Sequence, residues 1–557
     1  MSSGENRPSR SVTDWRQLAE ELEKVFEETF PVELLDRSPD PLRILLVPSA
    51  DAPNEPSYLI SLHLDVGFIR VVRAGGDEAA SVTVEVSPEW PIRLLSGIVV
   101  DRDVATTIMP MIGTSQLQVR PPKAALLLLP LVSFQLAEEQ RRGVTDVLAR
   151  HGSSLLDQAG VQVDRRAFAW PRQDSLDEIP VVVGASDDGA MAENLTAYVR
   201  REIAGQTTAG VQIVVRRGGR DVVTLAAGWA GAEDPMLEST VQPWACCSKV
   251  IGALLFAHAW SDDRLDPEQS IADVVPEFGA YGKGDVTFRH LLSHTTNVEG
   301  EALWLEFLSG RPPDLDRICR LPVLAGVEPG SRPNYSILWG WAVLAEALAR
   351  IEGIGYCDLA WHKILGDLDH SGEIIFGPAR VSDGPAMRSN LHITRYWYRG
   401  AGAPLPEQPF VGPTMLHQGS PSSGAYGSAR ALTDLLGVIR QAQNNAWGLV
   451  TPATMEACLG PARPPMRDPF LFGRELGWGL GLMNDFSFYR SRRAARPVDP
   501  VDLVGHIGLG SACSVWRPAD DTQVTVLWNC TLDTAPARRR EAALLEIVFG
   551  GREPLRV

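Results

Sequence analysis

The sequence predicts a mixed α/β fold, of the α+β kind, in two unlike parts. Runs of β-branched and aliphatic residues of strand length alternate with segments of helical periodicity along the chain. All seven cysteines lie after residue 245, so the two ends of the chain differ in composition. The 557 residues are 45% hydrophobic and 22% charged, a globular composition that is long enough for two or three separate cores.

Residues 1–170 are predicted to form a small α+β domain. Apolar residues at helical spacing indicate a helix over residues 12–30, and residues 131–158 also favour a helix. Between them, strands are expected at residues 44–47, 58–64, 68–72 and 81–86, with a hairpin turn at Asp65-Val66-Gly67. Nothing in this part of the sequence indicates a chemical role.

A polar stretch rich in proline and glycine, residues 171–190, is the expected linker. Residues 191–557 are then predicted to form a second domain. It begins with a helix at residues 193–204 and continues with two strands, 211–216 and 222–225, joined by a turn at Gly218-Gly219.

Composition excludes several classes of partner and location. A net charge of -17 and a pI near 5.1 argue against nucleic acid and against an anionic membrane surface. The first residues contain no apolar signal segment, and the longest aliphatic run, residues 124–131, is broken by Pro130 and is too short to span a bilayer. The cysteines form no disulfide framework or zinc pattern. We therefore expect a reducing, cytoplasmic setting, with no metal and no cofactor.

The tetrad Cys246-Cys247-Ser248-Lys249 precedes an apolar run, residues 250–257. Residues three apart share a helical face, so the Cys246 sulfur and the Lys249 ammonium can meet at the start of a helix. A nearby cation and a helix N-terminus both raise the thiolate fraction of a thiol. The alternatives are a lysine that reaches outward from the helix and cysteines that pack as small hydrophobes. Because only five of the 52 basic residues are lysines, a lysine placed here for general solvation is not expected.

Five further segments accompany this tetrad in a fixed order. They are residues 286–296 (VTFRHLLSHTT), 329–336 (PGSRPNYS), 424–434 (GAYGSARALTD), 477–481 (GWGLG) and 505–510 (GHIGLG). Together with the S-x-x-K-like tetrad, they resemble the class C β-lactamase-related family of esterases, transacylases and DD-peptidases. The resemblance covers residues 190–550. It implies an antiparallel sheet flanked by helices plus an all-helical lobe, with Cys246 at a helix N-terminus between them.

The resemblance also implies roles for particular residues. Cys246 would be the nucleophile, deprotonated by Lys249 or by Tyr335. Lys249 and a protonated His506 would supply the positive field that a Tyr335 phenolate needs. The backbone N–H groups of Cys246 and Leu509 would form an oxyanion hole, beside Gly508 of the H-x-G motif.

Two positions depart from the family pattern. Cysteine stands at position 246, where the family has serine, and Ile337 replaces the asparagine of its Y-x-N motif. The lost amide is a group that could bind a substrate carbonyl, so Ile337 makes β-lactam and peptide substrates less expected.

Three hypotheses follow. The first is an acyl-transfer enzyme with an acyl-Cys246 intermediate, either a transacylase or a thioester or ester hydrolase. It would use a small-molecule acyl donor and acceptor, and a carrier-bound thioester is one candidate donor. The second is an ordinary esterase or amidase of the family, and the third is an inactive descendant that binds a ligand. A binding protein has no need for Lys249, Tyr335, His506 and Gly508 together, so the sequence favours an enzyme.

Overall fold

The computed structural model divides the chain into two compact units, residues 1–163 and 164–557, which are described separately. In the first unit it describes the strands between residues 42 and 120, together with Lys24 and Glu28. In the second it describes residues 176–550 except 232, 299–313, 325, 379–390, 395–396, 400–404, 407–418, 469–473, 490–501, 509–510 and 533.

The first unit contains a five-stranded sheet in the order β3-β2-β1-β4-β5. Its strands are β1 (Leu42–Pro48), β2 (Tyr58–His63), β3 (Phe68–Arg73), β4 (Val82–Val86) and β5 (Leu117–Arg120). β2 and β3 pair as the predicted hairpin, whereas β4 runs parallel to β1. Of the two predicted helices, residues 131–158 lie outside the described residues, and in residues 12–30 only Lys24 and Glu28 are described, both helical.

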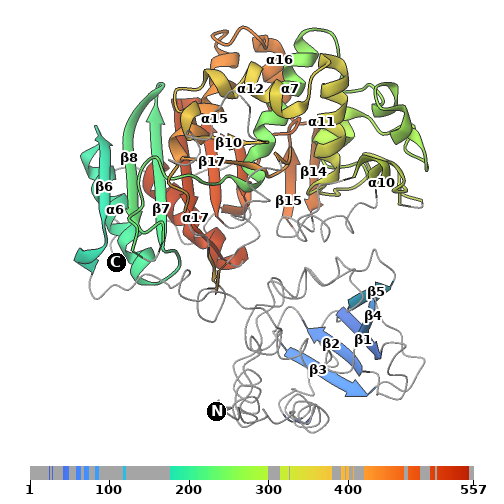
Figure 1. Ribbon diagram of the computed structural model, residues 1–557, viewed down its shortest axis with the longest axis horizontal. Helices are drawn as coiled ribbons and strands as arrows, with labels where there is room; N and C mark the ends of the chain where they lie inside the picture. Colours follow the sequence, from blue (N-terminus) through green and yellow to red (C-terminus); the bar gives the residue numbers. More distant parts are fainter. Residues whose placement is uncertain are drawn as a thin grey trace, which may run out of the picture. The chain divides into compact units, whose positions relative to one another are not determined.

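The second unit is built on a six-stranded antiparallel sheet in the order β16-β17-β18-β7-β8-β6 (Figure 1). These strands are β6 (Val181–Ser186), β7 (Gly210–Arg217), β8 (Arg220–Gly228), β16 (Val504–Gly508), β17 (Ala512–Arg517) and β18 (Thr522–Trp528). The two ends of the domain sequence thus meet in the centre of the sheet, where β18 pairs with β7.

The edge strand β6 corrects the predicted linker. Residues 171–190 were expected to connect the domains, but Val181, Val182 and Val183 pair with β8. The β-branched run favours an extended strand, and the neighbouring β8 offers it unpaired backbone groups. The polar composition around this run concealed it.

Helices cover both faces of the sheet because side chains alternate along each strand. On β7, Val211, Ile213 and Val215 belong to the core shared with helices α6 (Gly189–Ala204) and α17 (Thr534–Phe549). On the opposite face, Val214 belongs to the core that contains α7 (Lys249–Ser261) and α15 (Ala429–Gln443). The domain is therefore a sheet between two helical layers.

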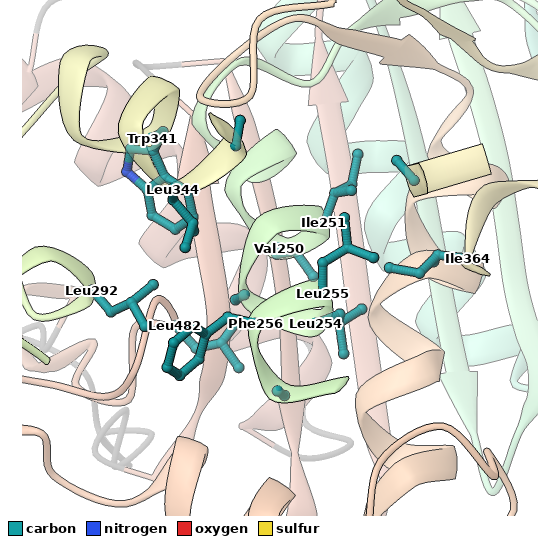
Figure 2. Close-up of a cluster of buried hydrophobic side chains, with 14 of the residues drawn as sticks. Val250, Ile251, Leu254, Leu255, Phe256, Leu292, Trp341, Leu344, Ile364 and Leu482 are labelled. Carbon is teal, nitrogen blue, oxygen red and sulfur yellow. The ribbon is translucent and has the colours of Figure 1, made fainter. Parts of the chain in front are cut away.

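α7 is the central helix of the lobe and is buried on every side from Lys249 to Ala259. Figure 2 shows its apolar side chains surrounded by residues of several other segments, including Leu292, Trp341 and Ile364. An α-helix that is apolar all round belongs in a protein interior. Among the described residues, this lobe also contains α8 (Phe288–Leu292), α10 (Leu315–Cys319), α11 (Trp339–Glu352), α12 (Tyr356–Lys363) and α16 (Pro452–Leu459).

Short strands complete the unit. They are β9 (Gln242–Pro243), β10 (Ile375–Phe376) and β13 (Ala425–Gly427) in one small sheet; β11 (Trp397–Arg399), β12 (Leu405–Pro406) and β19 (Cys530–Leu532) in another; and the hairpin of β14 (Arg463–Asp468) and β15 (Arg474–Trp478). The predicted sheet-and-lobe architecture of the second domain is confirmed.

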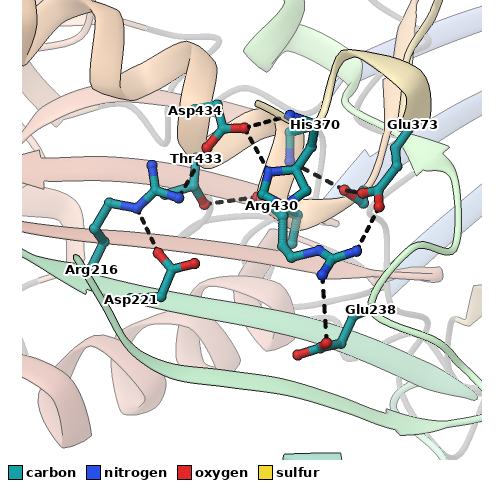
Figure 3. Close-up of polar contacts among 11 residues, drawn as sticks. Arg216, Asp221, Glu238, His370, Glu373, Arg430, Thr433 and Asp434 are labelled. Atoms are coloured by element: carbon teal, nitrogen blue, oxygen red, sulfur yellow. Dashed lines mark hydrogen bonds and ion pairs between the residues drawn. The ribbon is translucent and has the colours of Figure 1, made fainter. Parts of the chain in front are cut away.

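A charged network joins the sheet to the helical layer (Figure 3). Asp434 on α15 accepts from Arg216 on β7 at 2.9 Å and from the His370 ring at 2.7 Å. A second branch runs from Arg430 to Glu373 at 2.5 Å. The Asp434 carboxylate raises the pKa of His370 above its ordinary value, so protonation of His370 strengthens this link between the layers.

Candidate active site

Cys246 lies in a short 3-10 helix, η5 (Ala245–Ser248), that leads directly into α7. The preceding residue, Ala245, has a φ of 47°, a backbone conformation that is unfavourable for a residue with a Cβ. Cys246 is partly exposed. The neighbouring Cys247 is fully buried, and its thiol donates to the carbonyl of His506 at 3.3 Å. The turn therefore presents one thiol and hides the other.

Lys249 is fully buried at the start of α7. Its Nζ donates to two main-chain carbonyls, Ile337 at 3.1 Å and Ser422 at 3.0 Å, and lies 5.5 Å from the centre of the Tyr335 ring. Burial lowers the pKa of Lys249, while negative charge and a hydrogen bond at Cys246 act in the opposite direction. The Lys249 amine is thus within hydrogen-bonding reach of the Cys246 sulfur.

Tyr335 is buried beside Lys249 and hydrogen-bonds the Cys246 side chain. Burial raises the pKa of Tyr335 well above its ordinary value, and the negative charge at Cys246 raises it further. The phenol therefore keeps its proton and acts as a donor toward the sulfur. The expected Tyr335 phenolate base is not supported by this environment.

The prediction of a protonated His506 is wrong. The imidazole is fully buried, and desolvation together with the Lys249 charge lowers its pKa to about 3. Its Nδ1 lies 2.7 Å from the carbonyl oxygen of Ile507, so the proton of the neutral ring belongs on Nδ1. His506 contributes a neutral dipole to the site, and Lys249 alone of the two supplies positive charge.

Gly508 ends β16 beside the Cys246 turn. A Cβ at this position would lie 2.9 Å from the Ala245 Cβ and 3.0 Å from the Trp244 carbonyl oxygen, so only glycine lets the strand approach so closely. Leu509, the other expected oxyanion-hole residue, lies outside the described residues. Ile337 is half-buried, and its contribution is the carbonyl that holds Lys249.

Several residues that the sequence did not single out complete the cluster. Trp478 lies edge-on to Tyr335 at 5.9 Å and to His506 at 6.0 Å between ring centres. Behind it, Arg463 and Asp468 form a buried ion pair at 3.0 Å. Trp478 lies in the GWGLG segment, so this motif could have predicted its place in the site. Nothing in the sequence indicates that Arg463 and Asp468 form an ion pair.

The chain belongs to the beta-lactamase family, because the family model described as Beta-lactamase matches residues 195–549. No curated protein matches the chain significantly. In the described parts of the chain, no helix is long and apolar enough to cross a membrane.

Solved structures with the same fold include penicillin-binding protein homologues and esterases. A penicillin-binding protein homologue from Caulobacter crescentus is 21% identical and has a TM-score of 0.53; the match covers 67% of this chain and 99% of that one. EstCE1, described as a hydrolase with promiscuous acyltransferase activity, is 20% identical over 64% of this chain and 99% of its own, with a TM-score of 0.51. A family VIII carboxylesterase is 16% identical over 66% and 99%, also with a TM-score of 0.51. The fold is thus one that hydrolases and acyltransferases share.

Proposed function

We propose that the protein is an acyl-transfer enzyme that forms a covalent acyl-Cys246 intermediate. The observation that carries the proposal is the setting of Cys246: a partly exposed sulfur that contacts the proton-bearing hydroxyl of Tyr335 and the fully buried amine of Lys249. A thiol with both an adjacent proton acceptor and an adjacent donor has what nucleophilic catalysis requires.

Acylation would begin with transfer of the thiol proton to Lys249, whose pKa is lowered by burial. The Cys246 sulfur attacks the acyl carbonyl carbon, the C–S bond forms, and the carbonyl oxygen becomes an oxyanion. Backbone N–H groups at the Cys246 turn and at the end of β16 are the proposed donors to that oxygen. Collapse of the intermediate breaks the bond to the leaving group, which takes its proton from Lys249.

Deacylation would reverse the roles. Neutral Lys249 accepts a proton from an amine, alcohol or water, which attacks the thioester carbon. The C–S bond then breaks, and the departing sulfur receives hydrogen-bond support from Tyr335. A thioester reacts readily with amines, so cysteine at this position favours transfer over simple hydrolysis. The description of EstCE1 as a hydrolase with acyltransferase activity is consistent with such a division.

Two other functions compete with this proposal. Ordinary ester or amide hydrolysis needs the same residues with water as the acceptor. A ligand-binding descendant would need none of them, and the sequestered Lys249 amine next to a partly exposed thiol favours catalysis over that reading. We also propose a reducing, cytoplasmic location, since all seven cysteines are free thiols.

Intact-protein mass spectrometry with panels of acyl thioesters, carrier-bound thioesters and activated esters tests the proposal. We expect one acyl adduct, which peptide mapping assigns to Cys246. Cys246→Ala should lower turnover by about a thousandfold or more. Cys247→Ala is the matched control, since its buried thiol takes no part, and it should keep the adduct.

Cys246→Ser separates transfer from hydrolysis. An oxygen ester resists aminolysis more than a thioester does, so the serine variant should retain some transfer to water and lose transfer to an amine. Turnover by Cys246→Ala at the rate of the parent protein would refute the covalent mechanism.

A further inference from the structure

His294 accepts hydrogen bonds from the backbone on both sides of Tyr335. Its main-chain carbonyl accepts the N–H of Asn334 at 2.7 Å, and its ring Nδ1 accepts the N–H of Ser336 at 3.2 Å. The imidazole also lies against the Tyr335 ring, with 4.3 Å between ring centres and 32° between planes. One residue therefore binds the backbone N–H groups of both neighbours of Tyr335 and packs against its aromatic ring.

The backbone of His294 is itself held in an uncommon conformation. Its φ is 57°, in the left-handed region that histidine and asparagine tolerate better than most residues. Its carbonyl also faces Arg463 Nη1 at 3.5 Å. The buried Arg463–Asp468 pair thus lies directly behind the residue that grips Tyr335.

Only the neutral form of His294 can make the second hydrogen bond, since its Nδ1 must accept from the Ser336 N–H. The ring is fully buried, and desolvation lowers its pKa well below the ordinary value, as do the charges of Lys249 and Arg463 and the nearby His506. The ring proton therefore belongs on Nε2, which is buried and has no hydrogen-bond partner among the described residues. The His294 ring therefore stays neutral across the pH range in which a thiol ionises, and its hydrogen bond from the Ser336 N–H persists over that range.

We infer that His294 is a positioning residue that holds the Tyr335 hydroxyl on the Cys246 sulfur. Its importance for turnover rests on the proposed function, but its effect on the sulfur does not. The Tyr335 hydroxyl can support a thiolate only if the tyrosine backbone is fixed at the correct distance. His294 is 41 residues from Tyr335 in the sequence, and it supplies that restraint through Nδ1 and through its ring.

Two variants separate the Nδ1 contact from mere bulk. In His294→Asn, the side-chain Oδ1 can take the place of Nδ1, and asparagine also tolerates the left-handed backbone. In His294→Gln, the longer side chain places its amide near Nε2 instead, so the Ser336 N–H loses its acceptor. The readout is the rate of iodoacetamide labelling of Cys246 at pH 7 in the full chain, which requires no substrate.

We expect Tyr335→Phe to slow this labelling by about tenfold, as fits loss of one hydrogen bond to a charged group. His294→Gln should slow it by a similar factor, whereas His294→Asn should keep at least about half of the parent rate. The double variant His294→Gln/Tyr335→Phe should be no slower than Tyr335→Phe, because His294 acts through the tyrosine. General damage to the fold would instead multiply the two effects.

Multiplicative slowing in the double variant, or a parent-like rate for His294→Gln beside a slow Tyr335→Phe, would overturn the inference. If His294→Gln does not fold, the asparagine variant decides, since a tenfold loss there would show that restoring the acceptor does not restore the site. A parent-like rate for Tyr335→Phe would remove the premise and overturn it as well. Absence of acyl transfer with an intact labelling pattern would refute the proposed function alone.

Discussion

Glu541 is a carboxylic acid buried in the core behind the Cys246 turn. Its Oε2 accepts a hydrogen bond from the Tyr489 hydroxyl at 2.7 Å, while Oε1 has no partner among the described residues. Burial raises its pKa to about 7, against the opposing effects of Arg540 and of the Tyr489 hydrogen bond. The buried thiols of Cys247 and Cys513 also face this carboxyl.

This pKa predicts that Glu541 makes the protein less stable as the pH rises. Between its ordinary pKa of 4.5 and about 7, the folded state binds the proton more tightly than the unfolded state. The protonated Glu541 therefore contributes its full stabilisation of the folded state below pH 4.5. That contribution is lost as the pH rises through 7, and the free energy of unfolding falls by about 3 kcal/mol. Glu541→Gln should remove this dependence, so denaturant unfolding should show a more stable variant at pH 8 and little change at pH 5.

Glu546→Gln on the same helix is the matched control, because Glu546 is only partly buried. It should leave the pH dependence of unfolding as it is in the parent protein. Parallel stability curves for Glu541→Gln and the parent would show that the carboxyl ionises in the folded state at its ordinary pKa.

At the scale of secondary-structure elements, Lys283 ties a turn to the end of α10. It is fully buried, and its Nζ donates to the carbonyl oxygens of Ala280 at 2.7 Å, Cys319 at 2.9 Å and Leu321. The rings of Phe278 and Tyr281 lie 5.2 and 5.3 Å from the same nitrogen. One ammonium group thus donates to three backbone carbonyls from two separate segments.

Lys283→Met keeps the length of the side chain and removes the donor. Three carbonyls would then be left without this partner, so we expect the free energy of unfolding to fall by about 3 kcal/mol. Lys363→Met, at a half-buried position on α12, should cost far less. Equal stability of the two variants in urea titrations would show that water replaces the lysine at no cost.

The elements themselves were largely predictable, whereas the states of the site residues were not. Turn residues and strand composition are local, and they predicted the β2–β3 hairpin correctly. The sheet-and-lobe domain was predicted correctly through the resemblance of the ordered motif segments to a known family. The neutral His506 could not be predicted, because its desolvation comes from segments far apart in the chain. The same holds for the hydrogen bond from the Ser336 N–H to His294, which joins the segments 286–296 and 329–336.

For the whole molecule, the chain divides into two compact units, residues 1–163 and 164–557, and we propose that they fold separately. The sequence predicts that proteases cut first between the units, because the polar stretch rich in proline and glycine before β6 is the expected linker. Because β6 is paired from Val181 onward, the susceptible segment should lie before it, and trypsin should cut first at Arg165, Arg166 or Arg172. The large fragment should keep the labelling rate of Cys246.

Glutamine at these three arginines should delay the first cut, which gel electrophoresis and mass analysis of the fragments would reveal. An initial cut within the β7–β8 hairpin, for example after Arg217 or Arg220, would contradict this arrangement.

The burial of Lys249 and Lys283 has a consequence for self-modification. Reactive acyl thioesters acylate exposed amines without a catalyst, so an enzyme that handles them exposes its own lysines to the substrate. Only five lysines occur in this chain; Lys249 and Lys283 are held by main-chain carbonyls, Lys363 is half-buried and Lys24 is exposed, while the abundant arginines are poor nucleophiles. Under the proposed function, few amines of the protein would compete with Cys246 for the acyl donor, so the mass spectrum of the loaded enzyme should show a single dominant adduct instead of a ladder of acylated lysines.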